Sequence, residues 1–438
     1  MYSNSLVSAI TIASDNVLLD FNQRKIQTAV ASTTAPLIVA NTVTDLVLNN
    51  IHLEAVGPAK FQRGGILVSN SFDVEIHSPV LLNFAGLLSN TALNALSVIT
   101  VKGLNVTNLY LKNDDDSTQL TGILFGAVSN FTFTDSSIFN ARVFVDNSQN
   151  GDLLRLKIDN TGAAGSIRGI QVVTNVDASY FQQKVTDNIR IEDSNIKIKN
   201  AAIGILVASL STPFNGNFIT RNVTIQNNVV SSITHTFYSI LLQRVEGAVI
   251  HNNAIASSTA GNYVGIFLIS SNGATVSNNN IRIRKDTIPG FVGGIFIERF
   301  AVVPVLTVGN FVRENNVVKT GLYSADRVDI GIGAGNPSLV DLKYNTFDRN
   351  NVSGFYYGVV DNIPGEGYAE CTIFSENFSN GNVVNYSVTT APPNNSIFLA
   401  NNVDGCKAPV PPAPPVPPAA LLETFEQDTF PMRELELE

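Results

Sequence analysis

Four charged residues in the C-terminal half of the chain are the first candidates for chemistry. Arg282 and Arg284 lie two positions apart in the densest basic stretch, and Asp326 and Asp329 follow roughly one repeat later. Two guanidinium groups could hold an acidic sugar, because arginine binds carboxylates through paired hydrogen bonds. Paired carboxylates are also what glycosidic hydrolysis requires. The alternative is that these residues form ordinary surface ion pairs, and the sequence alone leaves that choice open.

The acidic run Asp114, Asp115 and Asp116 is a second candidate site. Calcium prefers several carboxylate oxygens, so the run could bind this metal, and a solvated acidic loop is the alternative. We find no phosphate-binding glycine loop, no nucleophile elbow and no zinc-spaced cysteine and histidine set, and we expect no cofactor. Two cysteines are too few for a disulfide framework. Cys371 falls on an expected inward position, and its pairing with Cys406 stays open.

The composition narrows the class of partner. The 438 residues carry 27 Lys and Arg against 36 Asp and Glu, so the net charge is −9. This balance argues against nucleic acid, whose phosphates require a positive binding surface. No apolar run reaches the length of about 18 residues that a membrane-spanning helix needs. The first residues lack the basic segment of a secretory signal peptide.

An internal repeat must position these side chains. Its first unit is a short strand of the form Gly-apolar-x-apolar, which returns about every 30 residues. Its second unit places a polar residue, usually asparagine, three positions after one apolar residue and two before the next. The first unit occurs at 65–68, 122–125, 169–172, 204–207, 239–242 (with serine in place of glycine), 265–268, 294–297 and 331–334. The second is clearest at Ile225-Asn228-Val230, Ile250-Asn253-Ile255, Val276-Asn279-Ile281 and Leu342-Asn345-Phe347, with a weaker copy at Ile373-Glu376-Phe378.

Together the two units predict a coiled backbone. Alternating apolar residues form short strands with one buried face. Asparagine tolerates the left-handed conformation of a sharp corner and hydrogen-bonds its local backbone. A chain that repeats strand, corner and strand must coil, and stacked coils pair equivalent strands in parallel. A β-sandwich is the alternative, but it does not predict the same corner residue at the same offset in successive units.

On these repeats, the chain resembles the right-handed parallel β-helix proteins of the pectate-lyase-like superfamily. The stretch from Ile10 to Asn22 is similar to the segment that leads into the first coil of such proteins. The resemblance covers roughly residues 10–403 and implies an all-β, right-handed parallel β-helix (a β-solenoid) of roughly ten to twelve coils. Members include polysaccharide lyases, hydrolases, epimerases, adhesins and virion proteins, so the resemblance implies no single activity.

The two ends of the chain differ from the repeats. Residues 1–9 are a short lead-in, and residues 404–418 form a Pro-rich linker that we expect to be an extended polyproline II spacer. The acidic and apolar tail at 419–438 is either disordered or a peptide that docks on a partner. The apolar residues of such a docking peptide would be Leu421, Leu422, Phe425 and Phe430.

The third position of each Gly-apolar-x-apolar strand points away from the core, because side chains alternate along a strand. None of these outward positions is charged, and most are apolar. Soluble proteins rarely leave a long apolar stripe bare. We therefore expect the chain's own loops, another subunit or a ligand to cover it. The candidate interface residues are Leu67, Leu124, Leu206, Leu241, Phe267 and Phe296.

Low charge, the apolar stripe and the Pro-rich acidic tail favour a non-enzymatic β-solenoid. We expect a structural or surface component of a virion, appendage or cell envelope, located outside the cell or on a virion. Its expected partners are other protein subunits, in a homo-oligomer or larger assembly, and glycans are a further option. The alternatives are a lyase, hydrolase or epimerase that acts on acidic glycans, and a glycan-binding adhesin or tailspike. Whether the chain is an enzyme stays open.

Overall fold

The computed structural model describes residues 8–22, 24–29, 31, 35–60, 62–84, 94–114, 121–163, 167–175, 185–199, 202–210, 219–233, 237–259, 261–285, 290–298, 307–323, 329–335, 342–363, 367–368, 371–388 and 396–399. The chain divides into two units, Met1–Asp404 and Gly405–Glu438, and all described residues belong to the first. The predicted linker and docking peptide therefore lie outside the described residues. No helix among the described residues is long and apolar enough to cross a membrane.

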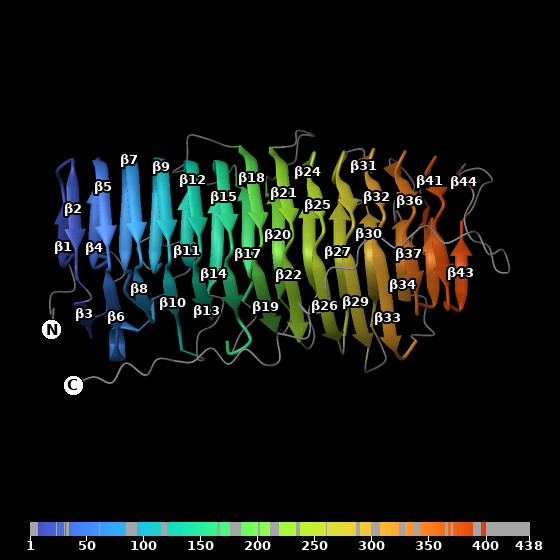
Figure 1. Cartoon of the computed structure of the whole chain (residues 1–438), viewed down its shortest axis with the longest axis horizontal. Coiled ribbons are helices and arrows are strands. Elements are labelled where there is room, and N and C mark those ends of the chain that lie inside the picture. Colours follow the sequence, from blue (N-terminus) through green and yellow to red (C-terminus); the bar gives the residue numbers. More distant parts are fainter. Residues whose placement is uncertain are drawn as a thin grey trace. The chain divides into compact units, whose positions relative to one another are not determined.

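Three rows of parallel strands build the first unit, and Figure 1 shows the strands of each row side by side in chain order. We call these rows the first, second and third sheets. The first sheet contains β1 (Ile10–Ile12), β4 (Ile38–Asn41), β7 (Ile66–His77), β9 (Leu96–Thr107), β11 (Thr121–Gly126), β14 (Arg142–Asp146), β17 (Ile170–Thr174), β20 (Ile203–Ser209), β23 (Tyr238–Gln243), β27 (Tyr263–Ile269), β30 (Val292–Glu298), β34 (Asp329–Gly335), β38 (Tyr357–Val360) and β43 (Val384–Ser387).

The second sheet follows the first within each coil. Its strands are β2 (Val17–Asp20), β5 (Thr44–Asn49), the later parts of β7 and β9, β12 (Ser129–Thr134), β15 (Gln149–Leu154), β18 (Thr186–Glu192), β21 (Thr220–Gln226), β24 (Val245–Glu246), β25 (Val249–His251), β28 (Thr275–Ser277), β32 (Phe311–Arg313), β36 (Thr346–Asp348), β41 (Ile373–Ser375) and β44 (Ile397–Leu399). Because β7 and β9 run through the corner, the first two sheets join into one 27-stranded sheet.

The third sheet has 13 strands and closes each coil. Its strands are β3 (Lys25–Thr28), β6 (His52–Ala55), β8 (Val80–Leu82), β10 (Tyr110–Lys112), β13 (Ser137–Phe139), β16 (Lys157–Asp159), β19 (Asn195–Lys199), β22 (Val229–Ile233), β26 (Ala254–Thr259), β29 (Asn280–Lys285), β33 (Asn316–Gly321), β37 (Asn351–Ser353) and β42 (Phe378–Asn380). Short elements outside the three rows are the 3-10 helix η1 (Gly57–Ala59), the pair β31 (Thr307–Val308) and β35 (Leu342–Lys343), and the pair β39 (Asn362–Ile363) and β40 (Gly367–Tyr368).

This arrangement is a right-handed parallel β-helix, and the predicted fold class is confirmed. Every strand pair of the three main sheets is parallel, and inward side chains form one continuous apolar core. The 13 strands of the third sheet give more coils than the ten to twelve that we expected. The extra coils lack the Gly-apolar-x-apolar unit on which the expectation rested: β4 and β14, for example, contain no glycine.

The corner between the second and third sheets carries the predicted asparagine ladder. Asn253 donates through its Nδ2 to the Oδ1 of Asn279 at 2.9 Å, and Asn279 donates in the same way to Asn315 at 2.9 Å. The left-handed residue of the corner is the one just before the ladder position, as at Asn252 and Asn278, where φ is 53° and 56°. The ladder runs through Ser194, Asn228, Asn253, Asn279, Asn315, Asn350 and Asn377.

A second, shorter ladder occupies the corner between the first and second sheets. There Asn310 donates to Asn345 at 2.9 Å, so the Asn345 unit belongs to a different corner from the other clear copies. The unit at Ile373 is misplaced by one residue. Glu376 takes the left-handed conformation, with φ of 50°, and the ladder position is Asn377.

Candidate functional site

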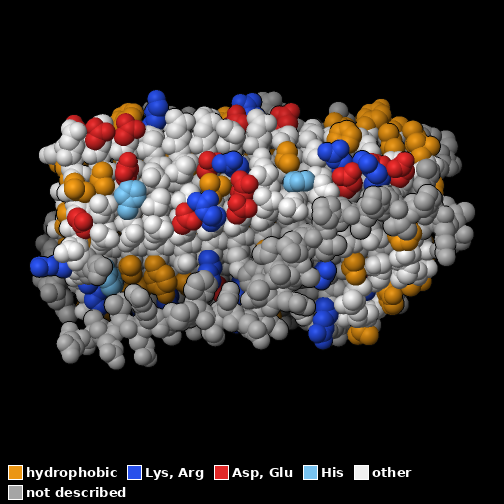
Figure 2. Space-filling view, in the orientation of Figure 1, with side chains coloured by type: hydrophobic (Ala, Val, Ile, Leu, Met, Phe, Trp, Pro, Cys, Tyr) orange, Lys and Arg blue, Asp and Glu red, His pale blue; other side chains and the backbone are white. Residues whose placement is uncertain are grey.

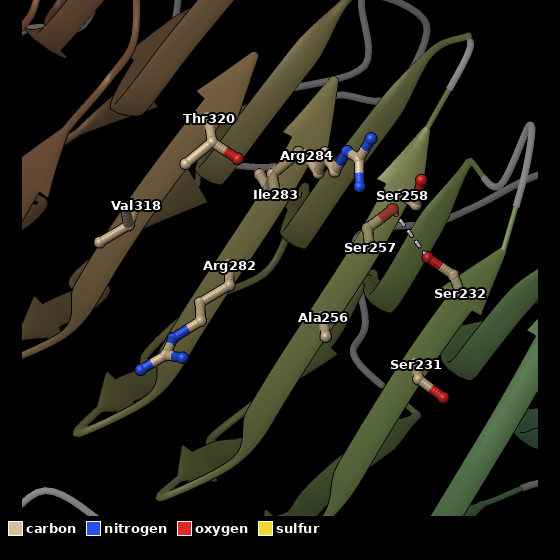
Figure 3. Close-up of a pocket in the computed structure, with 10 residues that line it drawn as sticks. All are labelled: Ser231, Ser232, Ala256, Ser257, Ser258, Arg282, Ile283, Arg284, Val318 and Thr320. Carbon is tan, nitrogen blue, oxygen red and sulfur yellow. Dashed lines mark hydrogen bonds between the residues drawn. The ribbon is translucent and has the colours of Figure 1, made fainter. Parts of the chain in front are cut away.

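Arg282 and Arg284 project from the outer face of β29 in the third sheet. The strand alternates strictly, because Ile281 and Ile283 are buried in the core and the two arginines between and beyond them are exposed. Residues two apart in a strand lie about 7 Å apart along it. Figure 3 shows the two guanidinium groups pointing away from each other, so they are placed to meet two separate anionic groups.

Small side chains on the neighbouring strands make a groove around these arginines. Arg282 lies in register between Ala256 of β26 and Val318 of β33, and Arg284 lies in register between Ser258 and Thr320. The groove has a volume of about 370 Å³. Its lining combines two cations with hydroxyl groups and short apolar side chains, which suits the hydroxyl, carboxylate and C–H surfaces of a sugar acid. We call it the Arg282–Arg284 groove.

The basic character continues two strands away from β26 along the same face. Lys197 and Lys199 of β19 align in register with Ser231 and Ile233 of β22, and the columns then continue into β26 and β29. A pair of lysines and a pair of arginines therefore flank strands with uncharged outer side chains. The two lysines were not among the predicted site residues, although their alternation with Ile196 and Ile198 is the signal that places them outward.

Asp329 does not join the arginines, which corrects the predicted four-residue cluster. Its side chain is fully buried at the start of β34 and forms an ion pair with the equally buried Lys319 at 3.1 Å. Lys285 is buried nearby and donates to the carbonyl oxygen of Gly290 at 2.7 Å. Burial lowers the pKa of Lys285; the charge of Asp329 opposes that shift, and the charge of Lys319 adds to it. Asp326 lies outside the described residues.

The acidic run gives no metal site within the described residues. Asp114 forms an ion pair with Lys60, and Asp115 and Asp116 lie outside the described residues. No group of three potential metal ligands occurs in the part of the chain that the structure describes. Cys371 is a half-exposed free thiol at a left-handed corner, with φ of 49°, rather than the inward residue that we expected, and Cys406 lies outside the described residues.

The apolar stripe on the outer face of the first sheet is buried. Leu241 and Phe267 are each 6% exposed, and Leu67 alone of the six candidates is half-buried. The other five candidates form, with neighbours such as Phe144 and Val173, a second apolar cluster separate from the core. Its outward orientation was predicted correctly, but side chains that a single chain already buries offer no free surface. The expectation of a subunit interface on these residues therefore does not hold.

Solved structures share this fold at low similarity. A variant of the periplasmic alginate epimerase AlgG matches with a TM-score of 0.46 and 10% identity, over 83% of this chain and 76% of that chain. PfbA, a surface adhesin of Streptococcus pneumoniae, matches with a TM-score of 0.43 and 12% identity, over 83% of this chain and 81% of that chain. No family model and no curated protein matches the chain. This likeness concerns the fold alone and assigns no activity.

Proposed function

We propose that this chain is a non-catalytic surface β-solenoid that binds an acidic glycan along the outer face of its third sheet. The observation that carries the proposal is the Arg282–Arg284 groove, in which Arg282 lies in register between the uncharged Ala256 and Val318. Arg282 makes no ion pair among the described residues. Arginine presents paired donors that match a carboxylate, and the hydroxyl of Thr320 lines the same groove, where it can meet a sugar hydroxyl.

The charge of the rest of the chain sharpens this proposal. With a net charge of −9, the molecule as a whole repels a polyanion. Attraction is therefore confined to a local basic area such as the one formed by Lys199, Arg282 and Arg284. Binding through exposed charges is screened over about 8–10 Å at physiological salt, so affinity should fall steeply as salt is raised. An extracellular or cell-surface location and assembly with other subunits belong to the same proposal.

A binding experiment with polygalacturonate tests the proposal, with neutral dextran as the control glycan. Changing Arg282 and Arg284 together to glutamine should weaken polygalacturonate binding at least tenfold, about 1.4 kcal/mol. The matched control changes Arg190 and Arg221 to glutamine, because these arginines are on the second sheet and already pair with carboxylates. Its affinity should stay within twofold of the wild type.

Three results would count against the proposal. The wild type would fail to retain polygalacturonate at low salt, or the control variant would lose as much affinity as the groove variant. Alternatively, incubation would release unsaturated or reducing ends from the glycan, which would make the chain an enzyme. The Asp329 position is uninformative for catalysis in this assay, because its carboxylate is committed to Lys319 inside the core.

A further inference from the structure

Two arginines on the outer face of the first sheet point at one neutral oxygen. Arg142 begins β14, and Arg168 lies two residues before β17. The Nη1 atom of Arg142 is 3.1 Å from the Oε1 of Gln171, and the Nη1 atom of Arg168 is 2.9 Å from the same oxygen. The two cationic groups are thus held close together, and Gln171 itself is buried.

Nothing among the described residues neutralises this pair. Neither arginine forms an ion pair there, and the only other side-chain acceptor of Arg142 is the Oγ1 of Thr121, at 2.6 Å. The Nε of Arg142 is buried and has no hydrogen-bond partner. Burial and the neighbouring charge of Arg168 lower the pKa of Arg142 to about 10, and burial also lowers the pKa of Arg168. Both groups remain protonated at neutral pH, so their like charges repel each other.

This arrangement has an energetic cost that an anion would remove. Buried charges in proteins are normally paired, because desolvation without a partner is expensive. Each guanidinium also keeps donors beyond those used by Gln171 and Thr121, since arginine has five. The ring of Phe144 lies 5.4 Å from the guanidinium carbon of Arg142 and restricts its position. Both arginines remain partly exposed, so solvent and small solutes reach them.

We infer that Arg142 and Arg168 form a binding site for an oxyanion, either the carboxylate of a sugar acid or a sulfate ester. A single oxyanion between the two guanidinium groups replaces mutual repulsion with charge-assisted hydrogen bonds on both sides. The site lies on the first sheet and is separate from the Arg282–Arg284 groove on the third, so it goes beyond the proposed function. Gln171 serves as the neutral positioning residue that holds the pair together when no anion is bound.

Thermal unfolding with small ligands tests the inference at constant ionic strength. Glucuronate and glucose 6-sulfate separate the two anion sources, and glucose is the neutral control. At least one of the two anions should raise the midpoint of wild-type unfolding, whereas glucose should not. Changing Arg142 or Arg168 to glutamine should abolish this rise. Without ligand, the Arg168→Gln variant should be no less stable than the wild type, because the repulsion is gone.

A matched variant makes the outcome decisive. Arg221→Gln, on the second sheet, should keep the ligand-dependent rise of the wild type, because Arg221 lies outside both proposed anion sites and already pairs with Asp187. The inference is overturned if neither anion stabilises the wild type, or if the rise survives in both Arg142→Gln and Arg168→Gln. It is also overturned if Arg168→Gln destabilises the unliganded protein while leaving the ligand response intact, because Arg168 would then be purely structural.

Discussion

Arginines on the outer faces of the second and third sheets have different neighbours in register. On the second sheet, Arg190 of β18 binds Asp152 of β15 at 3.0 Å, and Arg221 of β21 binds Asp187 of β18 at 3.0 Å. Each partner comes from the preceding coil. Figure 2 shows that basic and acidic side chains adjoin one another at several places on the face in view. On the third sheet, Arg282 has Ala256 and Val318 beside it instead.

In a stack of coils, the neighbours in register decide whether a charged side chain finds a partner. Adjacent strands lie about 4.8 Å apart, so an arginine meets whatever residue the next coil places at the same position. Opposite charges in register pair without any further adjustment of the backbone. On the second-sheet face Arg190 and Arg221 each pair with a carboxylate, whereas Arg282 of β29 has only uncharged neighbours in register. Single residues therefore determine whether an arginine on either face is paired, and single substitutions should reverse it.

The largest expected effect concerns the charge pair inside the stack rather than on either face. Lys319→Met leaves the buried carboxylate of Asp329 without its partner and should lower the free energy of unfolding by about 3–5 kcal/mol. Arg221→Met breaks an exposed pair that solvent screens and should cost below about 1 kcal/mol. Urea unfolding of both variants against the wild type measures the difference. Equal losses would show that Lys285 alone satisfies Asp329, and the buried pair would then not differ from the surface pairs.

Carboxyl groups in the two regions should also differ in how their contribution to stability depends on pH. Burial raises the pKa of Asp146, on the outer face of the first sheet, to about 7, from an ordinary value of 3.8. Between about pH 4 and 7 the folded state keeps a proton that the unfolded state loses, so stability should fall as pH rises through this window. Asp146→Asn should remove that fall and gain up to about 4 kcal/mol at pH 8.

Asp135, at the corner that follows β12, is a control for which we expect the opposite pH dependence. Its hydrogen bond with Arg155 lowers the pKa of its carboxyl group, so its contribution is present above its ordinary pKa and is lost as pH falls. Asp135→Asn should therefore lower stability at pH 7 and have a smaller effect at pH 3. Thermal midpoints at pH 3, 5 and 8 for both variants measure the two slopes. If Asp146→Asn leaves the pH dependence unchanged, the carboxyl group titrates normally.

The sequence was sufficient to predict the coils because their signals are local and repeated. Alternation reveals which side of a strand is inward, and the ladder asparagines recur at a fixed offset from it. The same apolar–asparagine spacing also occurs at two different corners, so the sequence alone could not separate Asn345 from Asn279. Coils without glycine, such as the one that contains β14, carry no repeat signal and were missed in the count.

The candidate site was predictable only for residues within one strand. Arg282 and Arg284 are outward because Ile281 and Ile283 are inward, and the same rule places Lys285 inside. The position of Asp329 depends on how a corner brings β34 against β33, and no local pattern records that. The stripe on the first sheet was placed outward correctly. Its burial depends on what covers it, which alternation along a strand does not report.

The smallest expected change in stability comes from a substitution that gives Arg282 a carboxylate neighbour, as the arginines of the second sheet have. Ala256 lies in register beside Arg282, so Ala256→Glu places a carboxylate where Asp152 stands beside Arg190. The new surface pair should add only about 0.2–0.5 kcal/mol to stability, because exposed pairs are screened. Polygalacturonate affinity should nevertheless fall roughly tenfold, since the glycan must now displace an internal partner. Ala256→Gln is the control, because it matches the size of glutamate without its charge.

Stability and polygalacturonate affinity, measured for both variants, distinguish an effect of charge from an effect of side-chain size. If glutamate and glutamine weaken binding equally, the groove excludes the glycan by volume, and the contrast between the faces is steric. If only glutamate weakens binding, and added salt reduces the difference between the two variants, the neighbour in register controls whether β29 is available to an anion. If Ala256→Glu increases stability without any loss of binding, the glycan binds elsewhere, because Arg282 is then paired and the affinity does not depend on it.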